Sequence, residues 1–367
     1  MSLVLFWGRA AARAGNSAAA AAKNAPSPFA QTRSHSASKS QLNINPPRSD
    51  KVLIATKVSG PGGLPWIRGG PPALDAKAIA AALDASLLRL KIGHVDLLQL
   101  HWPDRWVPMF GARDYDPSSA PYASCPLEEQ LEALGAAVRG GKARSVGLSN
   151  ETAWGVARCG ALAEFSRDSS GEAYPRVASV QNAYSLLCRT AEVGGGVMEA
   201  CDREGASLLA YGPLAAGHLT GKYLSFAPGG GSGGHPPEPA PATPESRLNK
   251  YRGRYAEAEM RYALDKPGLE GAVRAYVSLA EEVGITPCAL AVRFVLSRPP
   301  ALVPSAVVGA TGEGQLRELL DAAAGGDGRG GGGQGRGGNG GGIDVGLSAE
   351  VLERIDAIHE RHPNPLP

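Results

Sequence analysis

The stretch from Val95 to Asp104, VDLLQLHWPD, decides the fold class of this 367-residue chain. Its first part, Val95–Leu100, has the length of one strand and is mostly apolar, and the polar residue His101 follows directly. A strand that is apolar along both faces is typical of a parallel sheet with helices on its outer side. Helical patterns are therefore expected on either side of this stretch.

Five similar apolar runs flank it along the chain. They are Val52–Thr56, Ser145–Leu148, Val177–Val180, Leu208–Ala210 and Ala306–Val308. Between them, apolar residues recur at helical spacing, as in Ile79, Leu83, Leu87 and Leu90. Asp75, Thr286 and Ser348 are placed to cap helices, Pro287 to occupy a first helical position, and Gly140 and Gly141 to end a helix. Strands alternating with helices predict βα units and a parallel sheet.

Six strands can be counted, whereas a closed (β/α)8 TIM barrel needs eight. A doubly wound sheet would normally carry a GxGxxG turn after an early strand, and no strand here is followed by one. The predicted fold class is therefore α/β, a (β/α)8 TIM barrel in which the first two βα units are not recognisable. Free strand edges are expected where those units would pair.

The composition is that of a globular protein with a sizeable core. Hydrophobic residues make up 43% of the chain, and the net charge of +2 gives no general attraction to nucleic acid or membrane. Five scattered cysteines form no CxxC pair, so neither a zinc cluster nor a disulfide framework is indicated. No apolar run approaches the roughly 20 residues of a membrane span.

The chain divides into a leader, residues 1–50, and one barrel domain, residues 51–367. Residues 1–49 contain no Asp or Glu but six Lys and Arg, a composition typical of an organelle transit peptide. This predicts a plastid or mitochondrial protein, with a generic disordered tail of a cytoplasmic protein as the alternative. Inserts rich in Gly and Pro at 228–244 and Gly at 325–342 are expected to form mobile surface loops.

Polar residues follow each of the six apolar runs. In a TIM barrel the active site is built at the carboxyl ends of the strands, so these residues should share one face of the sheet. A single polar residue after a strand is more often structural, but six of them form a functional pattern. They are Lys57, His101, Ser149 with Asn150, Gln181 with Asn182, Tyr211, and Gly309 with Thr311.

The segments ATKVSG, VDLLQLHWPD, GLSNETAWGV, SVQNAYSLL, LLAYGPLAAGHLTGKY and VVGATGEGQLREL resemble the aldo-keto reductases in order and spacing. The resemblance runs from about Lys51 to Pro367 and is greatest to the Tas-like branch, relatives of the potassium-channel beta subunits. It implies an NADP-dependent oxidoreductase that reduces aldehydes or ketones to alcohols. The segment Pro103–Pro126 would line the substrate pocket, although the sequence does not identify the substrate.

The resemblance also implies how the cofactor NADP would be bound. Ser149, Asn150 and Gln181 would hold the nicotinamide carboxamide, and Tyr211 would stack on the nicotinamide ring. The loop beside the pyrophosphate would be formed by Gly212, Pro213, Leu214 and Ala215. Lys222 and Arg247 would contact cofactor phosphates, and the adenosine end would be held by Gly309, Thr311, Gln315 and Glu318. Leu319 departs from the family pattern, which usually has Asn there.

Members of this family use a catalytic tetrad of Asp, Tyr, Lys and His. Lys57 and His101 match it, but residues 1–49 contain neither the Asp nor the Tyr that normally lie upstream. The expectation is a chain lacking half its tetrad, through a gene-model error or degeneration, with feeble activity in which His101 partly replaces the tyrosine as proton donor. The alternative is a catalytically impaired nucleotide-binding or regulatory protein. The expected partner is a small carbonyl substrate, and the oligomeric state is not predicted.

Overall fold

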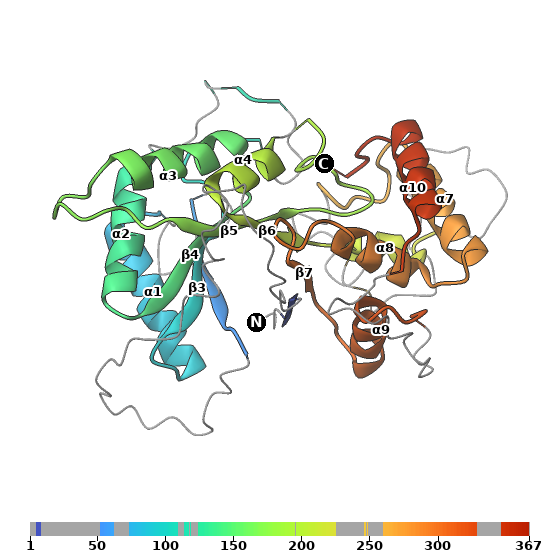
Figure 1. Cartoon of the computed structure of the whole chain (residues 1–367), viewed down its shortest axis with the longest axis horizontal. Coiled ribbons are helices and arrows are strands. Elements are labelled where there is room, and N and C mark those ends of the chain that lie inside the picture. The colour runs from blue at the N-terminus through green and yellow to red at the C-terminus, as the bar shows by residue number, and fades with distance from the viewer. Residues whose placement is uncertain are drawn as a thin grey trace, which may run out of the picture.

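A curled sheet of six parallel strands, with one antiparallel strand at its end, forms the centre of the molecule (Figure 1). The parallel strands pair in the order in which they follow along the chain. They are β2 (Ala55–Val58), β3 (Val95–Leu100), β4 (Ala143–Ser149), β5 (Val177–Ala183), β6 (Ser207–Tyr211) and β7 (Ser305–Val308). All six predicted strands are confirmed, with bounds that shift by a few residues.

The structure is a computed structural model, and it describes part of the chain. It gives the backbone of residues 5–8, and in full residues 52–61, 73–108, 114–116, 118, 124–194, 196–224, 246, 248, 260–328 and 346–366.

Strand β1 (Leu5–Gly8) was not predicted. It pairs antiparallel with β7, with Leu5 opposite Val308, so it extends the sheet at the end opposite to β2. The rest of the leader, up to Lys51, lies outside the described residues, and its transit-peptide character stays a prediction. The described residues form seven strands, so a closed eight-stranded barrel is not seen among them.

Helices cover the outer side of the sheet, as the alternating pattern predicted. In Figure 1, α1 to α4 lie along the part of the sheet from β2 to β6, and α7, α8 and α10 gather beyond β6 and β7. The helices are α1 (Ala76–Leu90), α2 (Leu127–Arg139), α3 (Ala153–Phe165), α4 (Val197–Glu204), the 3-10 helix η3 (Ala215–Thr220), α7 (Leu269–Glu282), α8 (Pro287–Leu296), α9 (Glu313–Ala323) and α10 (Ala349–Arg361).

The predicted helix caps are confirmed. Asp75 accepts a hydrogen bond from the Ala78 amide at 2.6 Å, and Thr286 accepts one from the Ala289 amide at 3.1 Å. Ser348 accepts one from the Val351 amide at 3.3 Å. Each cap satisfies an amide that the first helical turn leaves without a partner, and so fixes where the helix begins.

The pleat of the strands separates two apolar layers. Residues such as Leu98 and Val180 point outward and join the main core beneath the helices. Leu97, Leu209 and Val307 form a small separate cluster on the inner, concave face. Because side chains alternate between the two faces of a strand, the register places every second residue toward the concave face. The same alternation decides which of the polar residues at the strand ends face the concave side of the sheet.

The first residues of the second insert contact the packed helices. The Asp327 carbonyl accepts from the Thr286 amide at 2.9 Å, and the Gly326 carbonyl accepts from Arg293 on α8. The Gly328 amide donates to Asp321 at 2.8 Å. Residues 325–328 therefore pack against α8 and α9, whereas residues 329–342 and the whole first insert lie outside the described residues.

Candidate functional site

Four of the predicted site residues share the concave face of the sheet at the carboxyl ends of their strands. Lys57 pairs in register with Gln99, which is two residues beyond the concave-facing Leu97. Ser149 pairs with Gln181, and Gln181 pairs with the concave-facing Leu209. Tyr211 packs against the concave apolar cluster.

Lys57, Ser149 and Gln181 form a hydrogen-bonded group. The Lys57 ammonium donates to the Gln181 side-chain carbonyl and lies 3.5 Å from the Ser149 hydroxyl. The Ser149 hydroxyl donates to the Gln181 backbone carbonyl at 2.8 Å. Ser149 and Gln181 are each 2% exposed. The sequence assigned Lys57 to catalysis and the other two to cofactor binding, and the structure brings the two sets into contact.

The Gln181 side chain provides a test of whether a nicotinamide fits this group. Its amide nitrogen Nε2 is buried and has no hydrogen-bond partner among the described residues. A buried donor without a partner is costly unless a ligand or water satisfies it. The oxygen of a carboxamide is an acceptor of the required kind, so the residues present fit the nicotinamide group.

His101 lies immediately after β3, where its amide donates to the Val58 carbonyl at 2.9 Å. Its ring packs on Trp102, with centroids 4.6 Å apart. Burial, together with the positive charge of Lys57, lowers the pKa of His101 to about 3. The imidazole is therefore neutral at neutral pH and can donate a hydrogen bond through its N–H. The expectation that protonated His101 serves as proton donor is not supported, because the buried site disfavours the imidazolium.

Asn150 links the ends of β3, β4 and β5. It adopts a left-handed conformation with φ of 52°, which Asn tolerates better than most residues. In that conformation its amide donates to the Gln181 carbonyl at 3.0 Å, and its side chain donates to the His101 carbonyl at 2.9 Å. The predicted carboxamide-binding residue is thus fixed directly to the predicted catalytic histidine.

The loop predicted to lie beside the pyrophosphate follows β6 and makes a tight turn. The Ala215 amide donates to the Gly212 carbonyl at 2.8 Å across Pro213 and Leu214. Gly212, Ala215, Ala216 and Gly217 all have positive φ. The Gly217 amide donates back to the Leu214 carbonyl at 2.9 Å, so the turn is closed by its own backbone.

Lys222 lies against this loop. Its ammonium is 2.7 Å from the point where a Cβ on Gly217 would lie, so the glycine leaves room for the lysine. Burial lowers the pKa of Lys222, and its charge lies over the Tyr223 ring at 5.1 Å. The cation is thus held beside the loop, and its predicted contact with a cofactor phosphate stays a prediction. Arg247, the other predicted phosphate contact, lies outside the described residues.

The residues predicted for the adenosine end lie together around the start of α9. Gly309 follows β7, and Thr311 precedes Gly312, which caps α9 without a side-chain hydrogen bond. Gln315 accepts from the Thr311 amide at 3.0 Å and hydroxyl at 3.1 Å. Glu318 lies on the same helix, where its carboxylate helps to raise the pKa of Cys288.

Leu319 is only 4% exposed and belongs to the main core. Its side chain therefore packs inside the protein. Compared with the Asn of the family pattern, Leu319 offers no polar group to the adenosine end of the cofactor.

A cavity of about 540 Å³ lies between the loop after β3 and the starts of α2 and α3. Its walls include Asp104, Arg105 and Cys125 from the segment predicted to line the substrate pocket, together with Trp154 and Arg158 of α3. Neither Lys57 nor His101 lines it. The prediction that segment 103–126 forms the substrate pocket therefore stays a prediction, since much of the segment lies outside the described residues.

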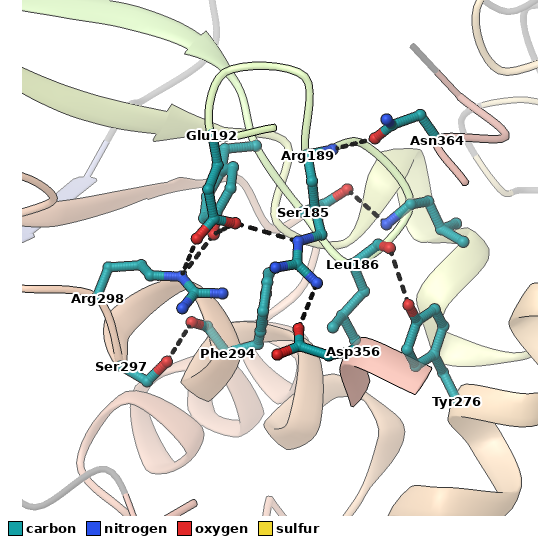
Figure 2. A network of polar contacts seen from close by, with 12 residues as sticks. Ser185, Leu186, Arg189, Glu192, Tyr276, Phe294, Ser297, Arg298, Asp356 and Asn364 are labelled. Carbon is teal, nitrogen blue, oxygen red and sulfur yellow. Dashed lines mark hydrogen bonds and ion pairs between the residues drawn. The ribbon is translucent and has the colours of Figure 1, made fainter. Parts of the chain in front are cut away.

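A network of charged residues holds the loop after β5 against the C-terminal segment (Figure 2). Arg189 donates to Glu192 at 3.1 Å and to Asp356 of α10 at 2.6 Å, and its amide donates to Asn364 at 2.6 Å. Tyr184 donates to Glu192 at 2.8 Å and accepts from Arg298 at 2.6 Å. The sequence alone does not reveal these contacts, because most of the partners are far apart along the chain.

Two negative findings apply to the described part of the chain. None of its helices is long and apolar enough to cross a membrane. No group of three or more His, Cys, Asp or Glu side chains there is arranged to hold a metal ion.

Comparison with known proteins points to one family. The model of the aldo/keto reductase family matches residues 31–324, beginning before Lys51. An aldo-keto reductase of Babesia bovis is 41% identical over 280 residues, which cover 74% of this chain and 88% of that protein. Protein tas of Escherichia coli (strain K12) is 37% identical over 321 residues, covering 87% and 77%. A probable voltage-gated potassium channel subunit beta of Arabidopsis thaliana is 28% identical over 275 residues, covering 75% and 69%.

Proposed function

Because the chain belongs to the Tas-like branch of the aldo/keto reductase family, we propose that it reduces an aldehyde or ketone to an alcohol with NADPH as cofactor. Enzymes of this family generally use NAD(P)H. The observation that carries the proposal is the contact of Lys57 with Ser149 and Gln181, beside a buried Gln181 amide that a carboxamide would satisfy.

The bound cofactor would supply the hydride. Ser149, Asn150 and Gln181 would orient the carboxamide, since hydroxyl and amide side chains match its donor and acceptor. Tyr211, at the end of β6, would lie against the nicotinamide ring. These contacts would fix which face of the ring is presented to the substrate.

The phosphates and the adenosine end would lie along the loop after β6 and the start of α9. The loop formed by Gly212, Pro213, Leu214 and Ala215 would lie beside the pyrophosphate, and Lys222 and Arg247 would offer positive charge. Gly309, Thr311, Gln315 and Glu318 would hold the adenosine end. The uncapped amides at the start of α9 favour a negatively charged group, which supports NADPH through its additional phosphate.

His101 and Lys57 would act on the substrate carbonyl. Neutral His101 would donate an N–H hydrogen bond to the carbonyl oxygen and so orient it. The Lys57 cation would stabilise the negative charge that develops on that oxygen as the hydride arrives, and a proton from solvent would then complete the alcohol.

A second candidate is a nucleotide-binding or regulatory protein with little catalytic activity. Residues 1–50 contain no tyrosine to serve as the family's proton donor, and one relative is named as a probable potassium channel subunit beta. General acid catalysis contributes about 10² to 10⁴ in rate, so its absence would leave binding with feeble turnover.

One experiment separates the two candidates. The purified chain is titrated with NADPH by fluorescence, and consumption of NADPH is then followed with a reactive aldehyde such as 4-nitrobenzaldehyde. Tight binding with steady turnover supports the reductase, and tight binding without turnover supports the regulatory role.

A matched pair of variants tests the assigned site. Gln181→Leu should weaken NADPH binding about tenfold or more, which is the loss of roughly one buried hydrogen bond. The control Gln130→Leu changes another buried glutamine, which donates to the Cys125 carbonyl at 2.8 Å. Equal losses in the two variants would contradict the site.

A further inference from the structure

Glu151 is a buried carboxylate that the proposed reaction does not use. It follows Asn150 directly and its side chain is 3% exposed. Arg105 forms a two-pronged ion pair with it, with Nη1 3.1 Å from Oε2 and Nη2 against Oε1. The Thr152 amide also donates to the carboxylate at 2.7 Å. Burying such a pair costs desolvation and is weak evidence for stability, so a role in fixing geometry is the better explanation.

Glu151 connects three parts of the candidate site, two through its ion pair with Arg105 and the third through its backbone. Arg105 lies four residues beyond His101 in the loop after β3, whereas Glu151 lies in the loop after β4. Asn182, at the end of β5, accepts from the Glu151 amide at 3.0 Å and donates to the Glu151 carbonyl at 2.7 Å. Glu151 therefore joins the loop that carries His101 to the strand that carries Gln181.

Gly155 shows that the chain makes room for this pair. It lies in the first turn of α3, where its amide donates to Thr152 at 3.3 Å. A Cβ at this position would clash with the Glu151 carboxylate and lie 2.7 Å from Arg105 Nη2. Alanine normally stabilises a helix interior relative to glycine, so the ion pair accounts for the absence of a side chain here.

We propose that Glu151 and Arg105 are a positioning pair, which sets the placement of His101 relative to Ser149, Asn150 and Gln181. The proposal rests on the proposed function, because it concerns the same site. A shift of about 1 Å between reacting groups lowers turnover by up to roughly a hundredfold. A bidentate arginine–carboxylate pair controls such a distance better than a lysine, whose charge is a single point.

Three variants test the pair, and one controls for it. Gly155→Ala displaces the pair without removing either charge, Glu151→Gln removes one charge, and Arg105→Lys keeps the charge but loses the fork. The control is Glu164→Gln, which breaks the pair of Glu164 on α3 with Arg176, 3.6 Å apart and more than half exposed on both sides.

The first measurement is amide hydrogen exchange in peptides 95–108, 143–156 and 177–187 of the full chain, without cofactor. The positioning role predicts faster exchange in all three peptides for each pair variant, and no change in the control. Faster exchange confined to peptide 143–156 would overturn the proposal, because it would mean that the pair stabilises only its own loop.

The second measurement is NADPH affinity and the kcat and KM for a reactive aldehyde. The pair variants should bind NADPH more weakly and lose about tenfold to a hundredfold in kcat, with Arg105→Lys losing least. Unchanged affinity and kcat, with only the unfolding temperature lowered, would overturn the positioning role. If the unsubstituted chain binds no NADPH, the proposed function fails, and the exchange pattern alone decides whether the pair positions the three loops.

Discussion

Replacing Arg189 with methionine should weaken the packing of the C-terminal segment against the loop after β5. Methionine retains the length of the apolar part of the side chain but removes the guanidinium at the centre of the network in Figure 2. The change abolishes the ion pairs to Glu192 and Asp356. It also removes the contact of the guanidinium with the Phe294 ring at 5.3 Å.

The expected loss follows from the burial of each partner. The Arg189 side chain is 8% exposed and Glu192 is 25% exposed, so their hydrogen bond falls in the range of about 1.5–3 kcal/mol for a charged pair. Asp356 is 56% exposed, and its pair contributes about 0.5 kcal/mol after solvent screening. Glu192 keeps Tyr184 and Arg298 as partners. The free energy of unfolding should therefore fall by about 2–3.5 kcal/mol, toward the lower end of the roughly 3–5 kcal/mol for an isolated buried charge.

Urea unfolding followed by circular dichroism measures this difference. The matched control is Arg354→Met, which removes an exposed pair with Glu282 from the same helix as Asp356, at exposures of 42% and 57%. The control should lose less than about 1 kcal/mol. A loss in Arg189→Met no larger than in the control would refute the argument from burial.

Three further predictions concern the site and the leader. Burial and the Lys57 charge hold the pKa of His101 at about 3 in the folded protein. The free energy of unfolding should therefore fall as the pH drops from about 6.5, the ordinary pKa of histidine in the unfolded chain, toward the folded pKa. A titration midpoint of the His101 ring near pH 6, measured by NMR, would contradict this. NADPH should bind more tightly than NADH by fluorescence quenching, and Arg247→Met should remove most of the difference; equal affinities in the unsubstituted chain would count against Arg247. Residues 1–45 fused to a fluorescent reporter should direct it to a plastid or mitochondrion and be removed; a diffuse, uncleaved reporter would argue for the cytoplasmic alternative.

The strands and helix starts could be predicted from the sequence because their causes are local. Apolar runs of strand length, capping residues such as Asp75 and Thr286, and the polar residues at strand ends are all visible within a few positions. The gathering of Lys57, Ser149 and Gln181 followed from the rule that parallel strands present their carboxyl ends on one side.

Other parts of the site could not be predicted because their causes are distant in the sequence. Glu and Arg usually lie on the surface of a protein, and only the fold shows that Glu151 and Arg105 form a pair packed beside Gly155. From its position in the sequence, Leu319 was expected to weaken adenosine binding. Its burial shows that the side chain is part of the core. Strand β1 escaped prediction because a short apolar run in a leader carries no sign of a partner near the other end of the chain.

The order of the strands has a consequence for synthesis on the ribosome. Each parallel strand pairs with the next one to be made, so β2 to β7 can join the growing sheet one after another as they emerge, without waiting for a distant partner. The exception is β1, which is made first but pairs with β7, one of the last strands to appear. Closing so long a loop carries the largest entropic cost of any pairing in the sheet. In a chain that still carries its leader, the addition of β1 should therefore be the last step in assembling the sheet, after the part that carries the site has formed.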